Sequence, residues 1–242
     1  MCGRYAVTLA PEAARAFFAY VERPNFPPRY NIAPTQPIPL VMARGYTSGR
    51  ERHFLLARWG FLPGFVKDPK TFPLLINARA ETLAEKASFR AALKRRRCLV
   101  IADGFYEWRR ATPGATRGPR QAYLIRRVDG APMGFAGLME TWSDPSGGEV
   151  DTACIVTTSA NRLVSAIHDR MPAILEPEAF SAWLDNDGVD VAAATALLRP
   201  APEPTLELTP LGPAVNSASN DDLSVQAPVG DEIRAAPPYA AR

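Results

Sequence analysis

The amino-acid sequence predicts one α+β domain, in which peripheral helices surround a mixed or antiparallel β-sheet. Its 242 residues are 47% hydrophobic and 22% charged, an ordinary composition for one large globular domain or two small ones. Its 24 prolines are about twice the usual share of roughly 5%, so the elements must be short. Strand-like and helix-like segments do not alternate regularly, and no Gly-rich phosphate-binding loop follows a strand, which argues against a doubly wound dinucleotide-binding fold.

The first third of the chain predicts two helices separated by an extended, proline-rich segment. The first runs over residues 11–20 after Thr8, with Phe17 and Phe18 on one face. The second runs over about 82–96.

The middle of the chain predicts a sheet. Apolar, strand-like runs are separated by turn signals rich in Pro, Gly, Asp and Ser. We expect strands at 98–102, 105–108, 123–127, 133–138 and 153–157.

The last third predicts short helices, one strand and a tail. We expect helices at 161–167, 177–184 and 189–198, and a strand at 205–211. A boundary near Gly130 would leave each half with an incomplete sheet, so we expect one domain over 1–227, followed by a disordered tail over 228–242.

Several protein classes are disfavoured. No apolar run approaches the roughly 18 residues that span a bilayer, and the N-terminus does not resemble a secretory signal, so we expect a cytoplasmic protein without a membrane partner. Three cysteines without a CxxC pair suggest neither a disulfide framework nor a four-thiolate zinc site. Two histidines without HExxH spacing make a metal site improbable, and we expect no cofactor.

Charge is distributed unevenly along the chain. Residues 1–127 carry 23 Lys and Arg against 8 Asp and Glu, a net +15, whereas residues 128–242 carry 5 against 17, a net −12. This asymmetry favours a basic face for a polyanion such as nucleic acid. The alternative is that the arginines are scattered over solvated surfaces and that 24 Arg to 4 Lys partly reflects genomic base composition.

Cys2 follows the initiator methionine and is small enough for Met1 to be removed. Removal would place an α-amine and a thiol on one residue, and the reference pKa of an α-amine, roughly 7.7 to 8.0, leaves part of it uncharged near neutral pH. Such an amine condenses with an aldehyde to an imine, and the thiol then closes a five-membered thiazolidine. The other interpretation is that Cys2 is a small buried residue at the start of a strand.

Three further polar residues stand in apolar surroundings. The amide of Asn77 ends an apolar run and must find partners. Glu107 lies among three aromatic residues, where burial would raise its pKa, although alternation leaves it equally free to face solvent. His168 is a natural proton shuttle, although a lone histidine is more often structural.

Six short motifs stand out along the chain: MCGRY at 1–5, RYNIAPT at 29–35, WGF at 59–61, INARAET at 76–82, DGFYEW at 103–108 and HDRMP at 168–172. In order and spacing, over about residues 2–227, they resemble the SOS-response-associated peptidase (SRAP) family. The resemblance implies a barrel-like sheet and a sensor of abasic sites in single-stranded DNA, which cross-links itself to the open-chain sugar aldehyde and shields the lesion. The family name refers to a second activity, proteolytic removal of the residue before the cysteine.

The resemblance implies four catalytic roles. Cys2 would supply amine and thiol, and Asn77 would position the N-terminal residue and the sugar. Glu107 would handle the proton of the amine, and His168 would act as acid and base in ring opening and reversal.

The resemblance also implies a DNA-binding set. Three arginines would bind the phosphates around the lesion, and two aromatic residues would stack against bases. The chain departs from the family where Phe65-Val66 is followed by an insertion over 67–72. The set comprises Arg4, Arg79, Arg170, Trp108, Phe65, Asn31 and Thr157.

The resemblance therefore implies a DNA-damage protein of the SOS response that acts on abasic single-stranded DNA, and we expect it to be a monomer close to the nucleoid. We also expect hydrolase or protease activity that removes the residue before Cys2, and weak lyase activity at abasic sites. One alternative is a cysteine peptidase or amidase in which Cys2 is the nucleophile and His168 the base. Another is a reader of single-stranded DNA without covalent chemistry.

Overall fold

The computed structural model describes residues 2–44, 51–109, 120–144 and 146–235. Five strands form a closed ring in the order β10, β4, β3, β6, β9 and back to β10. All neighbours in the ring are antiparallel except β10 and β4, which are parallel. The mixed, barrel-like sheet that was predicted is therefore confirmed. The ring strands are β3 (Pro37–Arg44), β4 (Glu51–Trp59), β6 (Arg97–Ala102), β9 (Met133–Ser143) and β10 (Glu149–Ser159).

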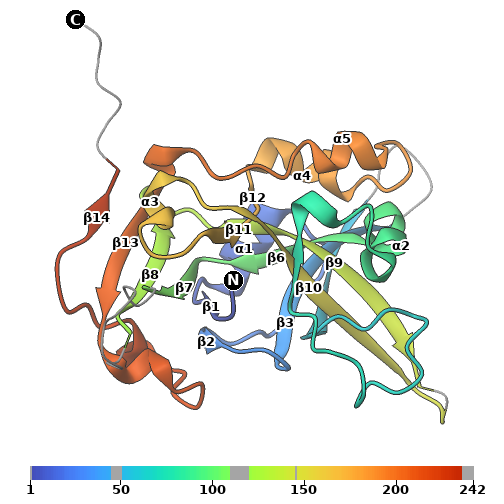
Figure 1. Cartoon of the computed structure of the whole chain (residues 1–242), viewed down its shortest axis with the longest axis horizontal. Helices are drawn as coiled ribbons and strands as arrows, with labels where there is room; N and C mark the ends of the chain where they lie inside the picture. The colour runs from blue at the N-terminus through green and yellow to red at the C-terminus, as the bar shows by residue number, and fades with distance from the viewer. Residues whose placement is uncertain (1, 45–50, 110–119, 145, 236–242) are drawn as a thin grey trace, which may run out of the picture.

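A second, antiparallel sheet lies beside the barrel (Figure 1). Phe105 and Tyr5 of this sheet pack edge-on against Phe135 of the barrel, with ring centroids 5.9 and 6.1 Å apart. The core therefore continues from one sheet into the other. In spatial order the strands are β14 (Ile233–Arg234), β13 (Leu206–Leu211), β8 (Ala122–Arg127), β7 (Gly104–Trp108), β1 (Tyr5–Val7) and β2 (Arg29–Ile32).

Three short strands extend the barrel sheet. The far half of β10 pairs in parallel with β5 (Asn77–Arg79) and antiparallel with β11 (Arg170–Pro172). β12 (Ile174–Leu175) pairs with β9. The end of β10 thus holds β5 and β11 close to the second sheet.

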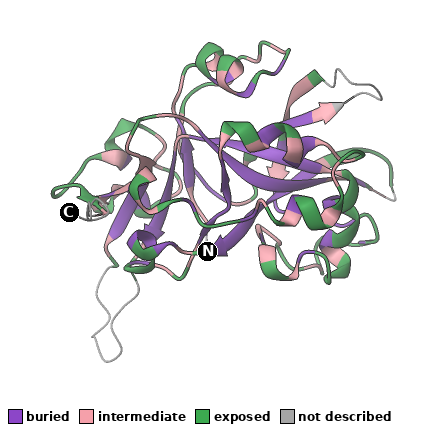
Figure 2. Ribbon diagram, turned by 90° about the horizontal axis from the view of Figure 1, so that it is seen from above, coloured by how far each residue is buried: buried purple, intermediate pink, exposed green. Residues whose placement is uncertain are grey.

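Helices lie at the periphery and expose their polar faces, while the strands carry most of the buried residues (Figure 2). Pro11 fits the first turn of α1, and the helix ends at Ala19, which has a left-handed φ of 56°. The α-helices are α1 (Pro11–Phe18), α2 (Ala87–Arg95), α3 (Arg162–Ser165), α4 (Pro177–Leu184) and α5 (Val191–Thr195), and the 3₁₀ turns are η1 (Ala80–Thr82), η2 (Glu203–Thr205), η3 (Pro213–Asn216) and η4 (Leu223–Gln226). None of the helices in the described ranges has the length and apolarity needed to cross a bilayer.

The structure differs from the sequence-based expectation in the proline-rich segment and at the C-terminus. Pro37 and Pro39 lie in β3 even though they lack an N–H donor, because β3 pairs with β6 only at Leu40 and Val41. The helix predicted from residue 82 begins instead at Ala87, after η1. Part of the tail that was expected to be disordered is ordered, because β14 pairs with β13.

Candidate functional site

Cys2 lies fully buried at the seam between the two sheets. From the barrel side, Asn77 Nδ2 donates a hydrogen bond of 2.9 Å to the carbonyl oxygen of Cys2. On the other side, Tyr106 N donates to Arg4 O at 2.9 Å, which continues the pairing of β1 with β7 and brings Glu107 next to the start of the chain. Burial alone would be consistent with a purely structural cysteine. The polar side chains of Asn77 and Glu107 beside Cys2 indicate a functional position instead.

The electrostatic surroundings of Cys2 keep its thiol protonated. Burial raises the pKa of the thiol, and the negative charge of Glu107 raises that pKa further. Near neutral pH the sulfur is therefore a thiol and not a thiolate.

Glu107 is 4% exposed, so it points inward. Residues two apart on a strand share a face, which places Glu107 on the face of Phe105 that packs against the barrel. The alternation of apolar and polar residues could not predict this orientation, because both faces of β7 are buried.

Only the donor side of the Asn77 amide has a hydrogen-bond partner among the described residues. Its nitrogen donates to Cys2, whereas its buried Oδ1 has no hydrogen-bond partner among the described residues. An acceptor is thus available beside the start of the chain.

His168 precedes β11 and is largely buried, with a side chain 15% exposed. His168 Nδ1 lies 3.0 Å from Arg170 N and 3.3 Å from Arg170 O, so an unprotonated Nδ1 accepts from that N–H and a protonated Nδ1 donates to that carbonyl. Asp169 Oδ1 lies 3.1 Å from the same Nδ1 and stabilises the ring when it is protonated. The surroundings therefore accommodate both protonation states.

Arg170 is held by two partners. Its NH1 and NH2 donate to the two carboxylate oxygens of Glu81 at 2.6 and 2.9 Å, and NH2 also donates to Thr157 O at 2.6 Å. The ion pair with Glu81 was not predicted, because 89 residues separate the two partners.

Arg4 anchors the start of the chain to η3. Its NH1 donates to Asn31 Oδ1 at 2.7 Å and to Val215 O at 3.0 Å, and its NH2 donates to Asn216 O at 3.3 Å. The guanidinium also lies 5.8 Å from the centre of the Trp108 ring, whose Nε1 donates to Asn216 Oδ1 at 2.7 Å. Asn216 was not among the predicted site residues.

Two predicted DNA-binding residues take a different role in this fold. Asn31 and Thr157 are both fully buried and cannot contact DNA directly in this conformation. Asn31 accepts from Arg4, and Thr157 accepts from Arg170. We therefore revise their predicted role from contacting DNA to holding the two arginines.

The remaining predicted residues are accessible. Arg79 is exposed on the same edge strand as Asn77. Phe65 is 60% exposed and packs edge-on against Phe72, with ring centroids 6.3 Å apart.

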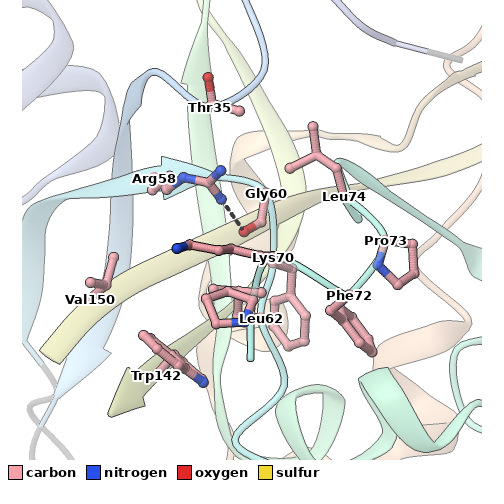
Figure 3. Close-up of a pocket in the computed structure, with 12 residues that line it drawn as sticks. Thr35, Arg58, Gly60, Leu62, Lys70, Phe72, Pro73, Leu74, Trp142 and Val150 are labelled. Carbon is pink, nitrogen blue, oxygen red and sulfur yellow. Dashed lines mark hydrogen bonds between the residues drawn. The ribbon is translucent and has the colours of Figure 1, made fainter. Parts of the chain in front are cut away.

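Phe72 lines a separate pocket of about 480 Å³, which sequence reasoning missed (Figure 3). Trp142 and Val150 form part of its apolar wall, while Arg58 and Lys70 supply positive charge. Arg58 NH1 donates to Gly60 O at 3.2 Å. Within the described part of the chain, no group of three His, Cys, Asp or Glu side chains is arranged to hold a metal ion.

Comparison with known proteins gives a consistent result. The model of the family described as SOS response associated peptidase (SRAP) matches residues 1–218. The abasic site processing protein YoqW of Bacillus subtilis (strain 168) is 36% identical over 224 residues, which cover 91% of this chain and 96% of YoqW. The abasic site processing protein HMCES of Xenopus tropicalis is 31% identical over 259 residues, which cover 91% of this chain and 76% of HMCES.

Solved structures share the fold. A crystal structure of a protein from Bacteroides thetaiotaomicron superimposes with a TM-score of 0.78 at 25% identity, covering 93% of this chain and 98% of the other. A phage-related protein from Bordetella bronchiseptica gives a TM-score of 0.67 at 31% identity, covering 87% and 94%.

Proposed function

Because the chain belongs to the SOS response associated peptidase (SRAP) family, we propose that it recognises abasic sites in single-stranded DNA and shields them through a covalent bond to Cys2. Its relatives YoqW and HMCES are named abasic site processing proteins, which supports the assignment of abasic DNA as the substrate. The observation that carries the proposal is the position of Cys2, whose carbonyl accepts from Asn77 and whose thiol lies in the field of Glu107.

The proposed reaction begins when Met1 is removed and Cys2 becomes the first residue. The uncharged α-amine attacks the aldehyde carbon of the ring-opened sugar, and the resulting carbinolamine loses one water to form an imine. The sulfur of Cys2 then adds to the imine carbon while the thiol proton passes to the nitrogen. The product is a thiazolidine, and the net change is the loss of one water.

The raised pKa of the thiol supports this order of steps. A protonated, buried thiol is a poor nucleophile toward the aldehyde, so the amine reacts first. The carboxylate of Glu107 is close enough to raise the pKa of the thiol. We assign it as the base that accepts the proton of the α-amine. The free Oδ1 of Asn77 is the acceptor that we assign to the amine or to a sugar hydroxyl.

We assign His168 to proton transfer during opening of the sugar ring and during reversal. The donor at Arg170 N and the carboxylate of Asp169 stabilise the neutral and the protonated ring in turn, which suits a group that must alternate between the two.

DNA binding would combine charge with stacking. Arg79 and Arg170 would bind phosphates on either side of the lesion, and Trp108 and Phe65 would provide stacking surfaces. Such contacts do not depend on base identity, as a lesion without a base requires. We expect a monomer in the cytoplasm, acting at the nucleoid.

A denaturing gel tests the proposal. Wild-type protein mixed with a single-stranded oligonucleotide that contains one abasic site should give a heat-stable adduct. Cys2→Ala should give none, while Cys98→Ala, which removes another buried cysteine, should still give it. An adduct that persists in Cys2→Ala would contradict the proposal.

The cysteine peptidase alternative is less well supported. A nucleophilic cysteine of that kind needs a lowered pKa, whereas burial and Glu107 raise that of Cys2. We limit the proposed peptidase activity to release of Met1. The imine intermediate acidifies the neighbouring C–H, so weak lyase activity at abasic sites is an expected side reaction.

A further inference from the structure

We propose that Glu81 competes with DNA for Arg170: it occupies the phosphate-binding edge of the guanidinium until a DNA phosphate displaces it. The inference rests on the proposed function, because it assumes that DNA is the polyanion.

The geometry of the Glu81–Arg170 pair resembles that of a phosphate complex. Two parallel N–H donors of Arg170 meet two oxygens of Glu81 at 2.6 and 2.9 Å. A guanidinium binds phosphate through the same paired donors, so the carboxylate imitates two phosphate oxygens.

Carboxylate and phosphate must compete for one edge of Arg170. The third guanidinium nitrogen, Nε, is buried, and the side chain as a whole is only 15% exposed. A phosphate that reaches Arg170 must therefore approach NH1 and NH2, the edge that Glu81 holds.

Displacement of Glu81 would leave Arg170 in place. NH2 also donates to Thr157 O on the buried strand β10 at 2.6 Å, and this contact does not involve Glu81. The carboxylate can turn into solvent without disturbing the core, since the side chain of Glu81 is 51% exposed.

Glu81 is also charged at neutral pH and next to a second DNA-facing arginine. The hydrogen bonds from Arg170 lower the pKa of Glu81, and the charge of Arg79 lowers it further. The carboxylate therefore neutralises part of the positive charge carried by β5 and β11.

The test compares Glu81→Gln with Glu85→Gln, a control that removes the same charge from an exposed residue four positions further on. Both are made in the Cys2→Ala chain, so that only non-covalent binding to a single-stranded abasic oligonucleotide is measured over a series of salt concentrations. Glu81→Gln should bind about 3- to 10-fold more tightly at low salt. Because Arg170 contacts a phosphate in both bound complexes, the logarithmic salt dependence of the two chains should be similar, whereas Arg170→Ala should flatten it by roughly 0.7, the value for one phosphate contact on a single strand.

Two results would overturn the inference: affinity in Glu81→Gln no higher than in Glu85→Gln, or a salt dependence that Arg170→Ala leaves unchanged. In an Arg170→Ala background, Glu81→Gln should gain no more affinity than Glu85→Gln, and a larger gain there would also contradict the inference. Adduct formation by the corresponding chains that retain Cys2 is scored in parallel. If none forms an adduct, the proposed covalent function fails, but the salt series still decides the role of Glu81.

Discussion

Asn77 Nδ2 lies 2.9 Å from the carbonyl oxygen of Cys2, and this hydrogen bond ties the barrel to the start of the chain. Its donor comes from β5, which pairs with β10 of the barrel, and its acceptor precedes β1 of the second sheet. The site is therefore built across the seam, and its geometry depends on how the two sheets pack.

The first prediction concerns this hydrogen bond. Asn77→Ala removes a partly buried hydrogen bond worth about 1 kcal/mol and also the free acceptor Oδ1, so adduct formation should slow by about 10-fold or more. Single-turnover rates on abasic single-stranded DNA measure the effect. A rate equal to that of wild type would show that Asn77 does not position the reacting residue.

The second prediction concerns Glu107. Glu107→Gln keeps the shape of the side chain but removes the base, so adduct formation should slow by roughly 10²- to 10⁴-fold. The pKa of the Cys2 thiol should fall at the same time, because the charge that helps to raise it is gone. Glu140→Gln, a change on the barrel beside Arg96, is a matched control that should leave the rate unaltered.

The third prediction concerns alkaline pH. Burial raises the pKa of the Cys2 thiol above its ordinary value of 9.0. A group whose pKa is raised by folding stabilises the native state below its ordinary pKa, and this contribution is lost as pH rises toward the native pKa. Above pH 9.0, wild type should therefore lose free energy of unfolding faster than Cys2→Ala. Denaturant titrations at several pH values test this, and parallel curves would contradict it.

The fourth prediction assigns different roles to Arg4 and Arg79, both of which the sequence predicted to bind phosphates. Arg4→Ala removes three hydrogen bonds to Asn31 and η3 and should lower the free energy of unfolding by about 2 kcal/mol or more. Arg79→Ala, at an exposed position, should leave stability nearly unchanged but reduce the salt dependence of DNA binding by roughly 0.7. Thermal melts and binding isotherms distinguish the two. Equal loss of stability in both variants would argue against this division.

Much of the fold follows from local patterns. Pro11 and Pro177 stand in the first turns of α1 and α4, which begin where proline is tolerated, and the apolar runs of β6 and β8 form strands as predicted. β3 was missed because its two prolines normally interrupt a sheet, and only the one-sided pairing of that segment explains why they fit.

The candidate site was predictable only in part. Motifs indicated Cys2, Asn77, Glu107 and His168, but their arrangement depends on pairing between strands far apart in the sequence. The inward orientation of Glu107 was undecidable because both faces of β7 are buried. The partnership of Glu81 with Arg170 carries no local signal and appears only when β5 and β11 flank β10.

Intact-mass measurement of wild type after incubation with an abasic single-stranded oligonucleotide tests the central claim most directly. The predicted product has the mass of the chain without Met1, plus that of the oligonucleotide, less one water. Detection of unmodified protein alone, or of an adduct on a chain that still carries Met1, would contradict the account.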